Sequence, residues 1–154
     1  MNLPYGFRNT GRQLTEKEVA GFEADIGAPL SGEYRSLLLA VNGGYPQNEG
    51  FDYGDGCSFA LKRLFPLTDE TEKHFNLRSL NLKFKDAPSD LLVIGISSFG
   101  DNLCLGIRGS YTGKVFWIDH EERDPDEAEE DEWLGVSELS PSFGEFMQSL
   151  KNLW

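Results

Sequence analysis

Residues 91–119 read LLVIGISSFGDNLCLGIRGSYTGKVFWID, and this stretch decides the fold. It contains three short β-prone runs, Leu91–Ser97, Leu103–Ile107 and Lys114–Asp119. The segments between them, Phe99–Asn102 and Gly109–Gly113, are rich in residues that favour turns. The stretch therefore predicts two hairpins in series, which together form an antiparallel meander.

Two amphipathic helices are predicted before the meander. Thr15 and Glu18 have the spacing of a capping box, and an apolar stripe follows over residues 16–26. Gly27 is then placed to end that helix in a left-handed conformation. A second apolar stripe predicts another helix that begins near Ser31 and ends at the Asn-Gly-Gly sequence after it.

The rest of the chain supplies a loop, a strand and two more helices. Gln47–Gly56, rich in Gly and Asp, favours a loop, and Cys57–Phe65 favours a strand. A cap and acidic residues favour a helix over Thr68–Leu80. Near the C-terminus, Ser140 is the expected cap of a last helix and Pro141 its first residue.

The order of these elements, helices first, a meander next and a helix last, predicts the α+β class. We expect a central, mainly antiparallel sheet with the helices packed on one face. The chain has 154 residues, of which 39% are hydrophobic and 12% aromatic, a composition typical of a folded domain. A single domain over residues 1–154 is therefore expected.

The formal net charge of −12 is concentrated in one segment. Residues 119–132, DHEERDPDEAEEDE, contain ten acidic residues and Arg123 as their one arginine. Such a charge argues against nucleic-acid binding, which needs Lys and Arg at the phosphates, and it favours a basic partner. The sequence therefore predicts an acidic loop at about 119–132 and no nucleic-acid partner.

Neither a membrane span nor a disulfide framework is predicted. The apolar runs are far shorter than the roughly 20 residues of a membrane helix, and the N-terminus lacks the pattern of an export signal. The two cysteines, Cys57 and Cys104, are isolated and are expected to be reduced thiols. A cytoplasmic protein without a membrane partner is the resulting expectation.

No catalytic or cofactor motif is present. Ser110 occupies the second place of Gly109–Gly113, so it does not form a G-x-S-x-G nucleophile elbow. The two cysteines and two histidines show no ligand spacing such as C-x-x-C, and the acidic run lacks the residue order of an EF-hand. The sequence therefore predicts no enzyme, no cofactor and no metal.

Trp117 and Trp133 flank the acidic run, which has two interpretations. Acidic tracts are commonly solvated loops that keep a protein soluble. Aromatic residues bordered by charge are also what protein-binding hot spots use, because charge speeds encounter and a buried ring supplies affinity. The composition leaves both interpretations open.

Five segments in order resemble the SUKH superfamily of the Smi/Knr type. The segments are LTEKEV through Phe22 with the following GAPLSGEYRSLL and VNGG, then LVIG at 92–95, FGDNLCL at 99–105, GKVFWIDHE at 113–121 and SFGEF at 142–146. The resemblance implies an α+β fold with a central, mainly antiparallel sheet. The acidic run at 124–132 departs from it, being longer and more acidic than the usual link.

The resemblance also implies a function, because bacterial domains of this type typically are immunity proteins that bind and neutralise toxins, many of them nucleases. The leading hypothesis is therefore a non-catalytic domain that binds a cognate, basic toxin. The candidate contact residues are Trp117, Asp119, His120, Glu121, Glu122 and Trp133. The alternative is a cytoplasmic regulatory interaction module with endogenous partners, as in eukaryotic relatives. The sequence does not decide whether the chain forms a homo-oligomer.

Overall fold

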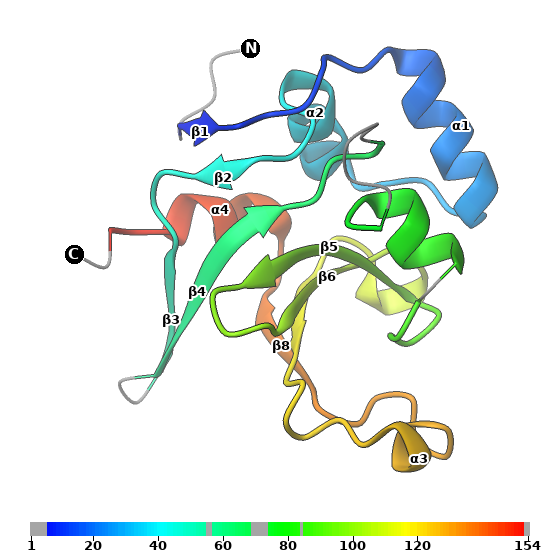
Figure 1. Cartoon of the computed structure of the whole chain (residues 1–154), viewed down its shortest axis with the longest axis vertical. Helices are drawn as coiled ribbons and strands as arrows, with labels where there is room; N and C mark the ends of the chain where they lie inside the picture. The colour runs from blue at the N-terminus through cyan, green and yellow to red at the C-terminus, as the bar shows by residue number, and fades with distance from the viewer. Residues whose placement is uncertain (1–5, 55–56, 69–73, 84, 153–154) are drawn as a thin grey trace.

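The predicted meander forms the middle of a six-stranded sheet in which every neighbouring pair is antiparallel. A computed structural model of the chain describes residues 6–54, 57–68, 74–83 and 85–152 (Figure 1). The strands follow one another across the sheet in chain order: β3 (Gly50–Gly54), β4 (Cys57–Leu64), β5 (Leu91–Ser97), β6 (Asn102–Gly106), β7 (Val115–Ile118) and β8 (Val136–Ser140). A separate pair, β1 (Phe7–Arg8) and β2 (Tyr45–Pro46), lies beside it.

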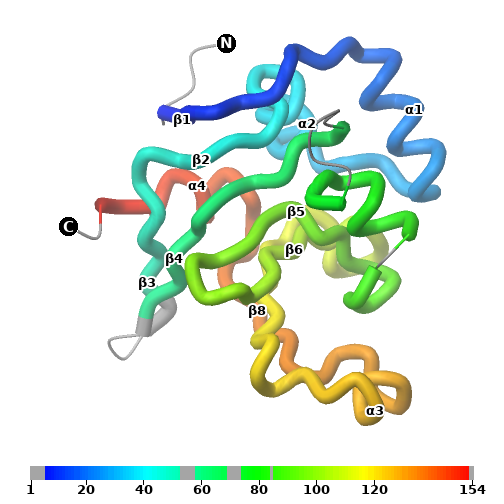
Figure 2. The backbone as a smooth tube through the Cα atoms, in the orientation of Figure 1, coloured from blue at the N-terminus to red at the C-terminus, as the bar shows by residue number. Residues whose placement is uncertain are grey.

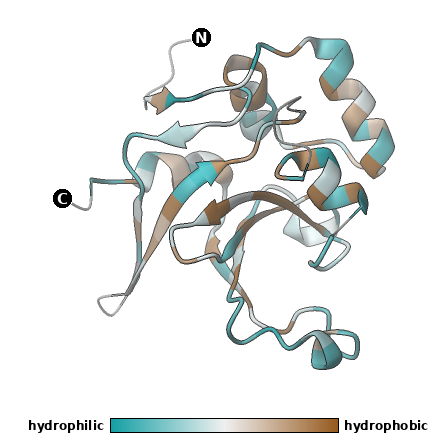
Figure 3. Cartoon of the chain, in the orientation of Figure 1, coloured by the Kyte–Doolittle hydropathy of each residue, from teal (hydrophilic) through white to brown (hydrophobic). Residues whose placement is uncertain are grey.

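The central strands carry the core. Along β5 every side chain is buried except Ile96, which is partly exposed, and Leu92 pairs with Leu105 across the first hairpin. Cys104 pairs with Phe116 across the second. Figure 3 shows this core as the hydrophobic centre of the sheet. Burial raises the pKa of the Cys104 thiol to about 12, so Cys104 is an inert core residue.

The sheet is strongly curled. Strands β5 and β6 separate β4 from β7, so in a flat sheet the backbones of β4 and β7 would lie about 14 Å apart. The rings of Phe59 on β4 and Trp117 on β7 nevertheless meet, with centroids 6.0 Å apart. The curl therefore brings the C-terminal end of β7, at Trp117, close to β4.

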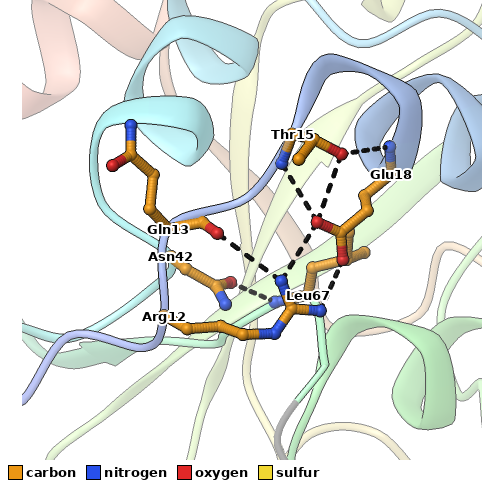
Figure 4. A network of polar contacts seen from close by, with 6 residues as sticks. All are labelled: Arg12, Gln13, Thr15, Glu18, Asn42 and Leu67. Carbon is orange, nitrogen blue, oxygen red and sulfur yellow. Dashed lines mark hydrogen bonds and ion pairs between the residues drawn. The ribbon is translucent and has the colours of Figure 1, made fainter.

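The two N-terminal helices form as their local signals predict. Helix α1 (Glu16–Ile26) has a capping box between Thr15 and Glu18, and Gly27 ends it at φ 75°. In Figure 4 the Arg12 guanidinium also pairs with the Glu18 carboxylate. That pair is the main reason why the pKa of Glu18 is lowered to about 2. Helix α2 (Gly32–Ala40) then packs against α1.

Helix α4 (Phe143–Ser149) joins the helices to the sheet. Phe143 packs edge-on against Tyr34 of α2, and Phe146 packs against Phe51 of β3, with centroids 5.2 and 4.9 Å apart. The expected cap at Ser140 is wrong: Ser140 is the last residue of β8, and the hydroxyl of Ser142 accepts the N–H of Glu145. A capping-box spacing starting at Ser142 competes with the Ser-Pro signal, and the strand pairing decides between them.

Three other expectations need correction. The predicted loop Gln47–Gly56 contains β3, in which Phe51 pairs with Phe59 of β4, so the loop prediction is wrong over residues 50–54. Strand β8 was not expected at all. The predicted helix Thr68–Leu80 lies partly outside the described residues; the described part has bends at 74–76 and a π-helical turn, η1 (Ser79–Lys83), which runs past Leu80.

Asn81 in η1 completes the edge of β5 where β4 diverges from it. Its carboxamide oxygen accepts the N–H of Val93 at 2.8 Å, and its NH₂ donates to the carbonyl of Val93 at 2.9 Å. The same NH₂ donates to the carbonyl of Leu77, which closes the turn. One buried side chain thus replaces the hydrogen bonds of a neighbouring strand.

A second buried asparagine fixes the end of α2. The carboxamide oxygen of Asn42 accepts the backbone N–H of Leu67 at 2.7 Å, as Figure 4 shows.

Helices and an antiparallel sheet share one core, so the α+β prediction is confirmed. Among the described residues, no helix combines the length and the apolar character needed to cross a membrane.

Candidate functional site

The site begins at the tight turn between β5 and β6. The hydroxyl oxygen of Ser97 accepts the backbone N–H groups of Phe99 at 3.1 Å and Asp101 at 2.9 Å. Gly100 has φ 92°, a conformation that glycine adopts without strain. The turn is therefore held from within, and it presents the ring of Phe99 to solvent with 76% of the residue exposed.

Asp101 joins this turn to the end of β7. One oxygen of its carboxylate accepts the backbone N–H of His120 at 3.1 Å and lies 2.6 Å from Nδ1 of the same residue. The Asp101 side chain is only 13% exposed, whereas that of His120 is 51% exposed. This hydrogen bond raises the pKa of His120, and the charges of Asp101, Glu121 and Asp119 act in the same direction.

A cleft of 290 Å³ opens between the turn and the end of β7. The partly buried Trp117 and the buried Phe59 form its floor, and Phe99 stands at its rim. Its polar lining includes the carboxylates that neighbour His120, namely Asp101, Asp119 and Glu121. The cleft therefore combines aromatic surface with negative charge.

The geometry of the same cluster bears on two kinds of chemistry, metal binding and nucleophilic catalysis. Ligand atoms of Asp101, Asp119 and His120 lie within 4.8 Å of one another. The distance of 2.6 Å from Asp101 to His120 is that of a hydrogen bond, because two ligands of one zinc ion lie about 3.4 Å apart. The Ser97 hydroxyl contacts Asp101 at 3.4 Å and caps the turn, an arrangement unlike a serine activated by a histidine.

The acidic segment beyond the cleft is an ordered structure. We call residues 119–135, between β7 and β8, the acidic excursion. The guanidinium of Arg123 donates to the carbonyls of Glu132 at 2.9 Å and Leu134 at 2.7 Å, and to the carboxylate of Asp86 at 2.8 Å. Only 6% of the Arg123 side chain is exposed. The single arginine of the segment therefore ties its two ends together.

A short helix lies at the tip of the acidic excursion. Asp124 caps α3 (Pro125–Ala128) by accepting the N–H of Asp126, and Pro125 occupies the first turn. Asp131 accepts the N–H of Trp133 in the same manner. In Figure 2 the excursion lies at the end of the molecule opposite α1 and α2. Asp124 and Asp131 thus stabilise the local backbone, while the acidic side chains of α3 are exposed to solvent.

A comparison with known protein families matches residues 13–149 to the SMI1 / KNR4 family (SUKH-1). The chain belongs to the SMI1/KNR4 family. The match includes the cleft, the acidic excursion and all strands of the large sheet. No match was found among curated proteins or among solved structures. The resemblance drawn from the five sequence segments is therefore confirmed.

In this SMI1/KNR4 chain, four of the six candidate contact residues lie together. Trp117, Asp119, His120 and Glu121 line the cleft. Glu122 is exposed but lies outside the lining.

Trp133 lies on the other face of the sheet, where its ring packs against Tyr111 and Phe116, with centroids 4.7 and 5.8 Å apart. Neighbouring residues of a strand point to opposite faces. Trp117 therefore lies on one face of β7, and Trp133, which packs on Phe116, lies on the other. Trp133 therefore anchors the acidic excursion to the core.

Phe99 and Asp101 are site residues of this SMI1/KNR4 chain that sequence reasoning missed. Asp101 was interpreted only as a turn residue, although it also bonds His120, 19 residues away in the chain. The sequence does indicate that Phe99 is exposed, because a large apolar residue in a turn beside Gly and Asp is expected at the surface and not in the core. The contact between the turn and the end of β7 arises only from the pairing of β6 with β7.

Proposed function

We propose that this chain is a non-catalytic binding domain that neutralises a cognate toxin in the bacterial cytoplasm. Membership of the SMI1/KNR4 family is consistent with such a role. The observation that carries the proposal is the cleft, where an exposed Phe99 borders carboxylates that continue into the acidic excursion. Exposed aromatic anchors beside charge are typical of protein-binding surfaces.

The charge of this face selects the class of toxin. A toxin that acts on nucleic acid presents Lys and Arg to bind phosphates, and an acidic surface attracts the same residues. An acidic protein that covers those residues blocks the toxin without chemistry of its own. A nuclease domain is therefore the expected partner, bound with an association rate that falls with salt.

The decisive experiment uses a candidate toxin domain, if one is encoded by a gene that neighbours the gene for this chain. We expect the purified chain to bind that domain and to abolish its activity at equimolar concentration, with weaker binding as salt rises. Activity that persists at saturating chain would sink the proposal. Binding of an endogenous regulatory protein in its place would favour the alternative function, an interaction module.

A further inference from the structure

Phe99 is an exposed aromatic residue on a rigid support. A single exposed apolar residue is common on protein surfaces and carries no argument by itself. Phe99 differs because the Ser97 hydroxyl fixes its turn, and because it borders a cleft with an aromatic floor. A turn whose backbone is already fixed loses little conformational entropy when a partner covers it, which favours binding.

The charge of the cleft is not balanced from within. Among the described residues that line it, His120 is the one basic group, and the carboxylates of Asp101, Asp119 and Glu121 face it. No lysine or arginine belongs to that described lining. Glu121 is exposed, and it forms no ion pair given for the described residues. A cation from outside would therefore complete the cleft.

The shape of the cleft restricts the cation further. A volume of 290 Å³ lies at the low end of the range for small-molecule sites, so it suits one side chain better than a nucleotide cofactor. Aromatic rings beside carboxylates favour arginine over lysine. The planar guanidinium stacks on a ring and pairs with a carboxylate at the same time, whereas ammonium is a compact, strongly hydrated charge.

We infer that this cleft receives one arginine side chain of the protein partner, stacked on the aromatic rings of the cleft and paired with Glu121 and Asp119. The inference rests on the proposed function, because it names the chemistry by which the same face would recognise its partner. Phe99 and Trp117 supply the stacking surface. Asp101 positions the turn and His120 and thereby shapes the cleft.

The probe is a short peptide, acetyl-Gly-Arg-Gly-amide, compared with its citrulline and lysine forms. Citrulline keeps the shape of arginine and removes the charge. We expect the arginine peptide to shift the NMR resonances of Phe99, Asp101 and the Trp117 indole in the ¹⁵N-labelled chain. The citrulline peptide should bind at least about fivefold more weakly. Equal binding of arginine and citrulline peptides, or of arginine and lysine peptides, would overturn the inference.

Two pairs of variants locate the binding. Glu121→Gln should weaken the arginine peptide about threefold or more, whereas Glu122→Gln removes the same charge outside the lining and should leave affinity unchanged. Phe99→Ala should weaken it about fivefold, whereas Leu82→Ala, which truncates another exposed apolar residue, should not. Equal losses within either pair would mean a diffuse field or a general surface effect and would contradict the inference.

The outcome can be separated from the fate of the proposed function. A toxin that is inhibited equally well by the wild-type chain and by Glu121→Gln and Phe99→Ala variants would uphold the function and overturn the arginine cleft. Selective arginine-peptide binding by a chain that leaves the toxin active would support the arginine-binding cleft and contradict the proposed toxin neutralisation. In both cases a dispersed NMR spectrum of each variant establishes that the fold is intact.

Discussion

At the scale of single residues, Asp101 and Arg123 organise the candidate site through charge. Asp101 accepts two hydrogen bonds from His120, and Arg123 donates to two carbonyls and a carboxylate. Each is well shielded from solvent, with 13% and 6% of its side chain exposed. Hydrogen bonds with a charged partner are stronger than neutral ones, so the loss of either residue should have a measurable effect.

His120 is expected to titrate above the usual histidine range. The Asp101 carboxylate favours the charged ring, so the folded-state pKa lies above the unfolded one. The stabilisation is therefore complete below the unfolded pKa of about 6.5 and disappears as pH rises through the folded pKa. An NMR titration of His120 should show the raised midpoint, and Asp101→Asn should lower it. A midpoint that Asp101→Asn leaves unchanged would disprove the pairing.

Replacement of Arg123 should release the acidic excursion. Arg123→Met keeps much of the apolar stem but leaves the carbonyls of Glu132 and Leu134 without their donor. We expect a loss of about 1–3 kcal/mol in the free energy of unfolding, measured with urea. Amide hydrogen exchange should accelerate over residues 124–134. Lys114→Met, which removes an exposed cation, serves as the control, and equal effects of the two variants would contradict this role.

At the scale of elements, the sequence predicted the helices and hairpins whose ends depend on residues close together in the chain. The capping box and Gly27 fixed both ends of α1, and turn-rich links fixed the meander, because the residues involved lie a few positions apart. Strand β8 could not be found in this way. Its Val136–Ser140 sequence has a weak alternation, and it becomes a strand by pairing with β7 across the acidic excursion.

The candidate site shows the same division. Trp117 and the acidic residues beside it were predictable from composition, since an aromatic residue beside a run of charge is visible in the sequence. The cleft was not predictable, because it depends on the curl that brings Phe59 near Trp117 and on the bond from Asp101 to His120. The second tryptophan that flanks the acidic run, Trp133, lies on the opposite face of the sheet, because its ring packs on Phe116 and not beside Trp117.

Asn81 offers a test of how an element edge is completed by a side chain. Asn81→Ala would leave the buried N–H of Val93 without its acceptor. We expect the free energy of unfolding to fall by about 2–4 kcal/mol, since a buried unpaired donor adds to the loss of the bonds. Urea unfolding gives the change. Asn48→Ala, in the loop before β3, is the comparison, and similar small losses at both sites would show that Asn81 does not complete the strand edge.

At the scale of the whole molecule, negative charge and the cleft occupy the same end. The acidic excursion starts at Asp119, which lines the cleft, and lies at the end of the molecule opposite α1 and α2 (Figure 1). Its caps, Asp124 and Asp131, have local structural roles. The exposed acids around α3 have no such role among the described contacts, so they are free to act at long range on an approaching partner.

Neutralisation of those exposed acids should therefore slow association and leave the fold intact. The variant combines Asp126→Asn, Glu127→Gln, Glu129→Gln and Glu130→Gln, and spares both caps and Arg123. At low salt we expect the association rate with the proposed basic toxin domain to fall about tenfold, with little change in dissociation. The difference should shrink as salt rises, because exposed charges are screened beyond about 10 Å at 0.1 M. A control with Glu127→Asp, Glu129→Asp and Glu130→Asp keeps the charge, and an equal slowing in this control would show that side-chain shape, and not the field of the excursion, governs encounter.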